Sequence, residues 1–150
     1  VKKQLLGVYD KSLIIPFAES LKKLGSTHAW IVHGSDGLDE VTITGKTYCA
    51  QLKDNEITEF FIHPSDLNIP TAKITDIIGG EPDENAKEII ALLNGKKSVF
   101  RDVVILNSAS ALLATGNASD LEEAATKSIQ SIDNGKALEK LNMLIKMTNN

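Results

Sequence analysis

The chain has 150 residues, 42% of them hydrophobic, which is enough for one compact domain with its own core. A formal net charge of −4 and only 5% aromatic residues argue against nucleic-acid binding, which relies on basic surfaces and stacking side chains. The single cysteine, Cys49, excludes an internal disulfide and a cysteine-based zinc site, and it fits a reducing compartment. No apolar run approaches the roughly 20 residues of a membrane span, so we expect no membrane partner. Because the N-terminus also lacks the long apolar core of a signal peptide, we expect a cytoplasmic protein.

The first third of the chain predicts a strand, a helix and a second strand joined by short connections. The apolar run 4–9 has the length of a strand, and Asp10 or Ser12 is suited to cap a helix that runs to Leu24. A second apolar run, 28–33, follows at once. One face of the helix is predicted to be apolar, at Leu13, Phe17, Leu21 and Leu24. This βαβ order predicts two parallel strands.

The middle of the chain predicts a β-hairpin. The segment VTITGKTYCAQL, which starts at Val41, alternates and is rich in β-branched residues, and Gly45 marks a turn or bulge within it. Lys53-Asp54-Asn55 is typical of a tight turn, after which EITEFFIH returns as a strand. The predicted hairpin spans 47–62.

The remainder of the chain predicts four helices. The first ends at Gly95, the second covers 98–115, Ser119 caps the third, and Gly135 separates the third from the fourth. The first helix is predicted to have one apolar face, made by Ala86, Ile89, Ile90 and Leu93. The third is predicted to face inward with Leu121, Ala124, Ala125, Ile129 and Ile132, and the fourth carries the apolar residues Ala137, Leu138, Leu141, Leu144 and Ile145. The fold class is α/β: a parallel βαβ unit and a β-hairpin, followed by a helical C-terminal half.

The loop after the second strand is the most informative segment for chemistry. It turns on two glycines and presents three carboxylates, those of Asp36, Asp39 and Glu40, within five residues. In α/β sheets, ligands bind beyond the carboxyl ends of the parallel strands. Adjacent carboxylates on a glycine-kinked loop suit Mg²⁺, which takes a few oxygen ligands and shares its remaining sites with water and phosphates. The alternative is a solvated acidic turn, since Asp and Gly are common turn residues.

Several short pieces along nearly the whole chain occur together, in the same order, in one known enzyme family. The run from His33 to Glu40, of pattern His-Gly-x-Asp-Gly-Leu-Asp-Glu, is the most specific of them. The weaker pieces are Gly7-Val8-Tyr9, Leu24-Gly25, Ala29–Gly34, Asn85-Ala86, Arg101–Asn107 and Ile132–Ala137. In these pieces the chain resembles the C-terminal portion of anthranilate phosphoribosyltransferase.

The resemblance implies a nucleoside-phosphorylase-like α/β domain and a magnesium-dependent phosphoribosyltransferase of tryptophan biosynthesis. Enzymes of this family transfer the phosphoribosyl group of phosphoribosyl pyrophosphate (PRPP) to anthranilate and release diphosphate. Carried over to this sequence, the family's magnesium ligands are Asp39 and Glu40. The resemblance also implies a homodimer for the full-length protein, whereas the oligomeric state of these residues alone is left open.

The family's phosphate loop, its anthranilate-binding arginine and its N-terminal helical domain all correspond to sequence upstream of Val1. We therefore interpret 1–150 as a single α/β domain, the C-terminal fragment of a larger catalytic domain, trimmed upstream because Val1 is not an initiator methionine. We assign no catalytic residue within it, leave the substrate-binding residues open, and expect these residues alone to be inactive and to bind magnesium weakly. Two alternatives remain: a relative of pyrimidine nucleoside phosphorylase, which would use phosphate without an Asp–Glu metal pair, and a non-catalytic domain on the same scaffold.

Several other polar or charged residues carry weaker predictions, and three of them have two interpretations. His33 either packs at a strand end or touches substrate, and Asp36 either tunes the metal site or caps the turn. Asn107 either packs among the small residues of its helix or makes a polar contact to an active-site loop. Arg101-Asp102 is predicted to be an ion pair at a helix start. His28 and His63 are expected at the surface or in turns.

Overall fold

A computed structural model describes residues 1–149 as a mixed sheet followed by a group of helices. The sheet runs in the order β1-β2-β3-β4, where the strands are β1 (Lys3–Gly7), β2 (His28–Gly34), β3 (Thr47–Lys53) and β4 (Glu56–Ile62). The α-helices are α1 (Ile14–Lys23), α2 (Pro82–Leu93), α3 (Val99–Ala114), α4 (Leu121–Asp133) and α5 (Lys136–Thr148). No helix in the described part of the chain has the length and apolar character needed to cross a membrane.

The predicted parallel βαβ unit is confirmed. β1 pairs in parallel with β2, so that Leu5 lies opposite Trp30, and α1 connects the two strands. A short 3-10 turn, Lys11–Leu13, precedes α1. The Asp10 carboxylate caps that turn by accepting a 2.8 Å hydrogen bond from the backbone N–H of Ser12.

The predicted hairpin is also confirmed, with both its bounds. β3 pairs antiparallel with β4 across a two-residue turn at Asp54 and Asn55, whose φ angles of 50° and 66° are those of a turn that matches the strand twist. Residues 41–46 share the strand-like alternation of the segment that starts at Val41, but they form no strand. There the backbone N–H groups of Val41 and Thr42 donate to side chains, those of Asn107 and Thr47, instead of to a neighbouring strand.

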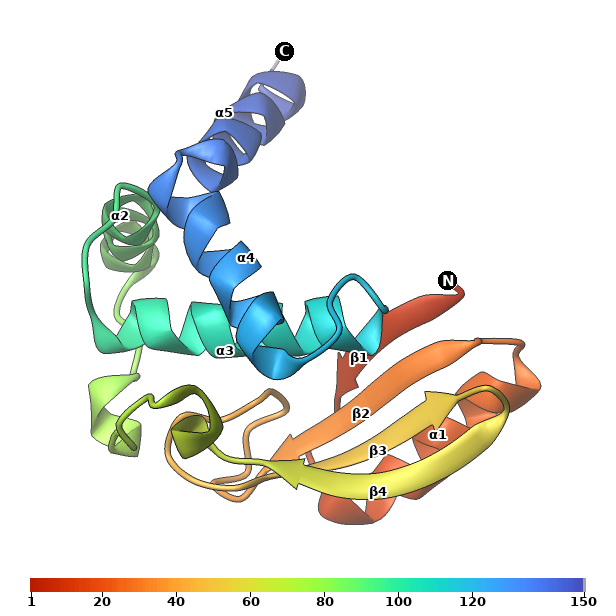
Figure 1. The fold of residues 1–150 in the computed structure, drawn as a ribbon. Helices are drawn as coiled ribbons and strands as arrows, with labels where there is room; N and C mark the ends of the chain where they lie inside the picture. Colours follow the sequence, from red (N-terminus) through yellow and green to blue (C-terminus); the bar gives the residue numbers. More distant parts are fainter. Residues whose placement is uncertain (150) are drawn as a thin grey trace.

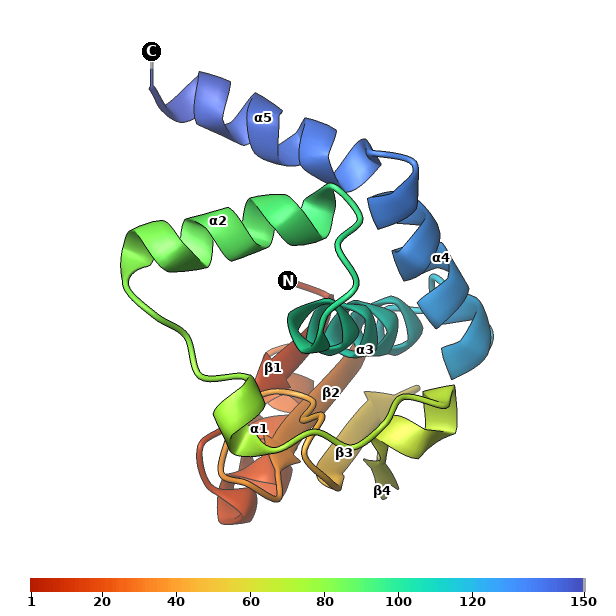
Figure 2. The same cartoon turned by 90° about the vertical axis from the view of Figure 1, so that its left-hand side faces the viewer.

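Helices cover both faces of the sheet, and β2 is therefore buried on both sides (Figure 1). Ala29 and Ile31 of β2 belong to a core cluster with α1, whereas Trp30 and Val32 point to the opposite face and pack with α3. Figure 2 shows α3 lying between the sheet and the outer helices α2, α4 and α5. Side chains of α2, α3 and α4 form a third core cluster.

One predicted inward position on the outer helices, Ile129 on α4, is wrong, because its side chain is exposed. The predicted apolar face of α2 and the apolar residues of α5 are also exposed in part, at Ile89 and Ile90 on α2 and at Leu144 and Ile145 on α5. The spacing correctly predicted an apolar stripe on each helix, but periodicity alone does not determine what packs against it. The cap of α4 is also corrected by one residue: Asp120, not Ser119, accepts the hydrogen bond from the N–H of Glu123 at 2.8 Å.

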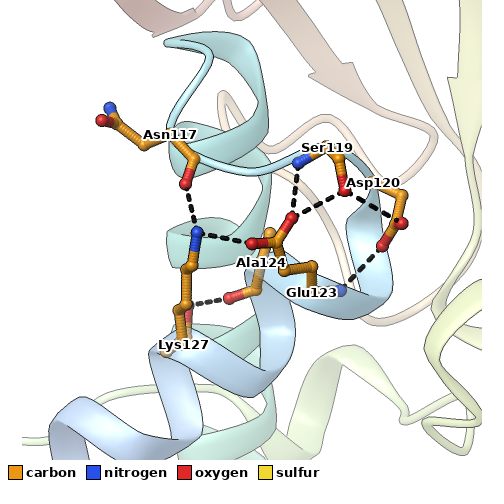
Figure 3. A network of polar contacts seen from close by, with 7 residues as sticks. Asn117, Ser119, Asp120, Glu123, Ala124 and Lys127 are labelled. Carbon is orange, nitrogen blue, oxygen red and sulfur yellow. Dashed lines mark hydrogen bonds and ion pairs between the residues drawn. The ribbon is translucent and has the colours of Figure 1, made fainter.

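Ser119 instead belongs to a polar network at the start of α4 (Figure 3). The Glu123 carboxylate accepts hydrogen bonds of 2.7 Å from the N–H and the hydroxyl of Ser119, and it pairs with Lys127 at 2.7 Å. Lys127 also donates to the carbonyl O of Asn117 at 2.7 Å. The bond with Lys127, followed by those from Ser119, lowers the pKa of Glu123 to about 2.

The network predicts a pH-dependent contribution of Glu123 to stability. A carboxyl whose pKa is lowered on folding stabilises the fold above its unfolded pKa, here ordinarily 4.5, and loses that effect as the pH falls to about 2. Glu123→Gln is therefore expected to lower the melting temperature at pH 7 and to match the wild type near pH 2. Melting curves of both proteins across this range test it, with Glu122→Gln, at an exposed neighbour, as the charge control. A Glu123→Gln deficit that is the same at every pH would contradict the prediction.

Candidate functional site

The acidic loop, residues 35–46, leaves the sheet at the carboxyl ends of the parallel strands. β2 ends at Gly34, and the pairing of β1 with β2 continues one step further through a 2.9 Å hydrogen bond from the N–H of Val8 to the carbonyl O of Val32. His33 Nδ1 lies 2.8 Å from the carbonyl O of Val8, to which it donates in the Nδ1–H tautomer. His33 thus ties the two strand ends together, in agreement with its structural interpretation. This is the edge at which α/β sheets bind ligands.

The backbone of the loop is closed by its own hydrogen bonds. The N–H of Gly34 donates to the carbonyl O of Leu38 at 2.8 Å, and that of Gly37 donates to Gly34 at 3.0 Å. Gly37 has a φ of +93°, a conformation that glycine adopts without strain. The N–H of Ser35 donates to the carbonyl O of Lys46 at 2.8 Å, which joins the two ends of the loop. The carboxylates that follow are therefore presented from a fixed turn.

The Asp36 carboxylate organises this loop from inside. Its Oδ2 accepts hydrogen bonds from the hydroxyls of Thr42 and Thr44, at 2.5 and 2.6 Å, and its Oδ1 accepts one from the N–H of Leu38 at 3.1 Å. Burial raises the pKa of Asp36, but these hydrogen bonds outweigh burial and the net shift is downward. Of the two interpretations of Asp36, the geometry favours the one in which it fixes the turn.

Asp39 and Glu40 differ from Asp36 in having no such partners. Among residues 1–149, no hydrogen bond or ion pair with another side chain or the backbone reaches either carboxylate. Asp39 is exposed, whereas Glu40 is half-buried. Burial, followed by the negative charges of Asp39 and Asp36, raises the pKa of Glu40. Two adjacent carboxylates with unused oxygen atoms and no protein cation beside them form a donor set that suits a hard cation.

Glu40 also forms part of the wall of a small, mainly apolar cavity of about 270 Å³. The rest of the wall comes from Leu38, from the segment after the hairpin and from the first turns of α3, at Ile74, Ile77, Ile78, Phe100 and Val103. No group of three or more His, Cys, Asp or Glu side chains in the described part of the chain is arranged to hold a metal ion. Asp39 and Glu40 nevertheless fit magnesium, which proteins commonly bind through one or two carboxylates together with phosphate oxygens of a substrate.

The structure brings two distant residues, Gly7 and Asn107, to the loop, and neither belongs to the motif. Gly7, the last residue of β1, lies so close to Asp39 that a Cβ atom there would be 1.4 Å from the carbonyl O of Asp39. The only sequence signal for it is a glycine inside the apolar run 4–9, which can mark a close backbone approach but does not identify the segment approached. Asn107 of α3 contacts the loop as well, through the backbone of Val41. Of its two interpretations, contact with this loop is therefore confirmed.

The other polar residues lie elsewhere. Arg101 and Asp102 do not form the predicted pair, because Arg101 is buried and its Nη2 donates to Asp133 at the end of α4, at 2.6 Å. Residues at successive positions of a helix do not face one another, which explains the error. His63 lies at a turn as expected, where its ring accepts a hydrogen bond from the N–H of Ser65. His28, at the start of β2, is only partly exposed and lies at the far end of the sheet from the loop.

Comparison with known proteins gives the family of the chain. Residues 1–138 match the model of the glycosyl transferase family, a/b domain. The chain is 46% identical over 149 residues to the anthranilate phosphoribosyltransferase of Parvibaculum lavamentivorans, a match that covers 99% of this chain and 44% of the relative. The enzyme of Azospirillum brasilense is 49% identical over 148 residues, covering 99% of this chain and 42% of the relative.

Solved structures agree with the sequence matches. The anthranilate phosphoribosyltransferase of Saccharomyces cerevisiae in complex with PRPP and Mg superposes with a TM-score of 0.86 at 28% identity, over 95% of this chain and 41% of the yeast chain. The enzyme from Thermus thermophilus gives a TM-score of 0.82 at 27% identity, over 91% and 40% of the two chains. The chain thus spans less than half the length of the relatives it matches, and it belongs to the glycosyl transferase family, as a homologue of part of anthranilate phosphoribosyltransferase.

Proposed function

We propose that the chain supplies the magnesium-binding part of an anthranilate phosphoribosyltransferase, with Asp39 and Glu40 as the protein ligands of the metal. The reaction is transfer of the phosphoribosyl group from PRPP to the amino group of anthranilate, with release of diphosphate, in tryptophan biosynthesis. The observation that carries this proposal is the pair of carboxylates at the carboxyl ends of β1 and β2, which have no hydrogen-bond or ion-pair partner among residues 1–149. Further support comes from the similarity to a yeast enzyme whose structure contains PRPP and Mg.

The residues of the loop have separate tasks in this proposal. Asp39 and Glu40 would supply carboxylate oxygen atoms to a metal ion that is shared with a diphosphate. Asp36 keeps the turn closed through the hydroxyls of Thr42 and Thr44 and thereby fixes where the pair begins. Bound magnesium would neutralise the negative charge that develops on the departing diphosphate. No side chain of the loop needs to act as a nucleophile, since positioning and charge stabilisation suffice for this transfer.

Several properties of the full-length protein belong to the same proposal. Contacts to PRPP and anthranilate come largely from residues outside the 150 of this sequence, so we expect these residues alone to show no turnover. The single α/β domain, 1–150, is then one part of a larger catalytic domain, and the full-length protein is a cytoplasmic homodimer. Robust turnover by the purified 150-residue chain would contradict this division of the site.

The test uses the longest natural polypeptide that contains these residues. Loss of anthranilate fluorescence is followed with PRPP over a range of magnesium concentrations, for the wild type and for Glu40→Gln. The variant is expected to lose at least about tenfold in activity at low magnesium and to recover part of it at high magnesium, because one metal ligand is weakened. Glu59→Gln, an exposed carboxylate on β4, is the matched control and should retain wild-type activity.

Two results would overturn the proposal. A wild-type polypeptide without magnesium-dependent loss of anthranilate would favour the phosphorylase or the non-catalytic alternative, and phosphate-dependent cleavage of a pyrimidine nucleoside would separate these two. An active wild type whose magnesium dependence is the same in Glu40→Gln would remove the metal role of the pair, and Asp39 and Glu40 would then be a solvated acidic turn.

A further inference from the structure

Asn107 holds the backbone next to the acidic pair with both ends of its side-chain amide. Its Oδ1 accepts a 2.9 Å hydrogen bond from the N–H of Val41, and its Nδ2 donates to the carbonyl O of the same residue at 2.8 Å. Nδ2 also donates to the carbonyl O of Val103, one turn earlier in α3, at 3.1 Å. The amide is 66 residues away in sequence from the backbone that it holds. A side chain that makes both bonds to one residue fixes the position and the orientation of that residue.

The bonds to Val41 act on Glu40 through the peptide link between them. The N–H of Val41 and the carbonyl of Glu40 belong to the same planar peptide group. A hydrogen bond that holds this N–H therefore also fixes the orientation of the Glu40 carbonyl. Beyond it, the Val41 side chain is fully buried, and the N–H of Thr42 donates to the Thr47 hydroxyl at 2.9 Å. The chain after Glu40 is therefore immobilised, and α3 is the element that sets where it lies.

Asn107 is itself well anchored. Its neighbour Leu106 is fully buried in the cluster between α3 and the sheet, and Ile105 is buried in the cluster with the outer helices. The side-chain bond to Val103 fixes the amide orientation further. The acidic pair thus obtains its position from the helix on one face of the sheet as well as from the strand that precedes it.

We propose that Asn107 is a positioning residue for magnesium binding, acting through Val41 on Asp39 and Glu40. This inference rests on the proposed function, and it extends that function to a residue that does not touch the metal. Groups that orient metal ligands without binding the metal typically contribute about 10–100-fold to metal affinity or activity. A role limited to satisfying the buried backbone of Val41 would change stability and leave metal affinity as it is.

Asn85 provides a matched control within the same chain. Its Oδ1 accepts from the N–H of Gly80 and its Nδ2 donates to the carbonyl O of Gly80, both at 2.8 Å, so it makes the same two bonds to a different loop. Neither Gly80 nor Asn85 contacts the acidic pair through any hydrogen bond among residues 1–149. Asn85→Asp and Asn107→Asp therefore remove the same kind of donor at two places.

The first experiment measures metal binding directly and needs no activity. Mn²⁺ is titrated into the 150-residue chain, and broadening of the backbone amide resonances of Asp39 and Glu40 gives the half-saturating concentration. We expect this concentration to rise about tenfold in Asn107→Leu, to rise less in Asn107→Asp, which keeps the acceptor for Val41, and to stay at the wild-type value in Asn85→Asp. If Asn107→Leu does not fold, Asn107→Asp alone carries the comparison.

The second experiment repeats the comparison in the longest natural polypeptide, with anthranilate and PRPP. Asn107→Leu is expected to raise the half-saturating magnesium concentration about tenfold and Asn107→Asp to raise it less, while the rate at saturating magnesium falls by much less than tenfold in both variants. Active wild type with unchanged magnesium dependence in the Asn107 variants would overturn the positioning role alone. Wild type without magnesium-dependent turnover would overturn the proposed function, and the positioning role with it.

Discussion

Gly7→Ala is expected to displace the Asp39–Glu40 segment and to destabilise the chain by about 3 kcal/mol, the upper part of the range for overpacking. A Cβ atom at Gly7 would lie 1.4 Å from the carbonyl O of Asp39 and 2.3 Å from its carbonyl C. Gly7 is paired in register with Val32 of β2, so β1 is not free to move away. The Asp39 peptide must therefore move, and the acidic pair moves with it.

Urea unfolding of the 150-residue chain measures the stability change, and the Mn²⁺ titration of the same samples measures the change at the pair. Gly45→Ala is the control within the same loop, because the nearest atom to its new Cβ would be the rotatable hydroxyl O of Ser35, at 3.0 Å. We expect Gly45→Ala to stay within about 1 kcal/mol of the wild type. Wild-type stability together with wild-type Mn²⁺ binding in Gly7→Ala would show that the close approach has no consequence for the loop.

The candidate site illustrates which contacts of a loop a sequence reveals. The acidic pair could be singled out as a candidate because Asp39 and Glu40 closely follow a buried strand and a glycine turn, and its role as a metal site stays a prediction. The close approach of Gly7 to Asp39 was not predictable, since it depends on how the end of β1 passes the loop in space. The two bonds of Asn107 to Val41 join α3 to the loop across 66 residues. The only signal for them in the sequence was a polar residue on a helix of small side chains.

The features of the fold that could be predicted were likewise those set by residues close together in the sequence. The bounds of the hairpin were correct because Asp54 and Asn55 tolerate the left-handed conformation that its turn requires. Val41 to Lys46 have the alternation of a strand, yet side-chain oxygens of Asn107 and Thr47 accept the N–H bonds that a strand would give to a neighbour. Propensity favoured a strand there, and long-range contacts decided otherwise.

The exposed apolar stripes on the outer helices show that burial could not be predicted from helical spacing. Ile89 and Ile90 on α2 and Leu144 and Ile145 on α5 have the spacing of a buried face, but their side chains are about half exposed. Helical spacing reports that a face is apolar and says nothing about its neighbour. The relatives that the chain matches are more than twice its length.

Removing the carboxylate of Asp133 is expected to be the most destabilising change away from the loop. Arg101 is 1% exposed, and its Nη2 donates to Asp133 Oδ1 at 2.6 Å, while its Nη1 is buried without a hydrogen-bond partner among the described residues. Asp133→Ala leaves the guanidinium buried with no countercharge in contact. Because the Asp133 side chain is itself 44% exposed, we expect a loss of about 2–3 kcal/mol, below the range for a fully buried pair.

A double-mutant cycle separates the buried charge from the loss of packing. Replacing both members, in Arg101→Met with Asp133→Ala, should recover much of the stability lost in Asp133→Ala, because the desolvated charge is removed and its volume is largely kept. Lys97→Met is the control: its Nζ lies 3.9 Å from Asp133 Oδ2 on a side chain that is 76% exposed, so its removal should cost less than about 0.5 kcal/mol. Urea unfolding of the wild type, the two single variants, the double variant and Lys97→Met gives the change in unfolding free energy for each. A double variant as unstable as the sum of its single changes would mean that Arg101 stabilises α3 against α4 by packing alone, and that the ion pair with Asp133 contributes nothing.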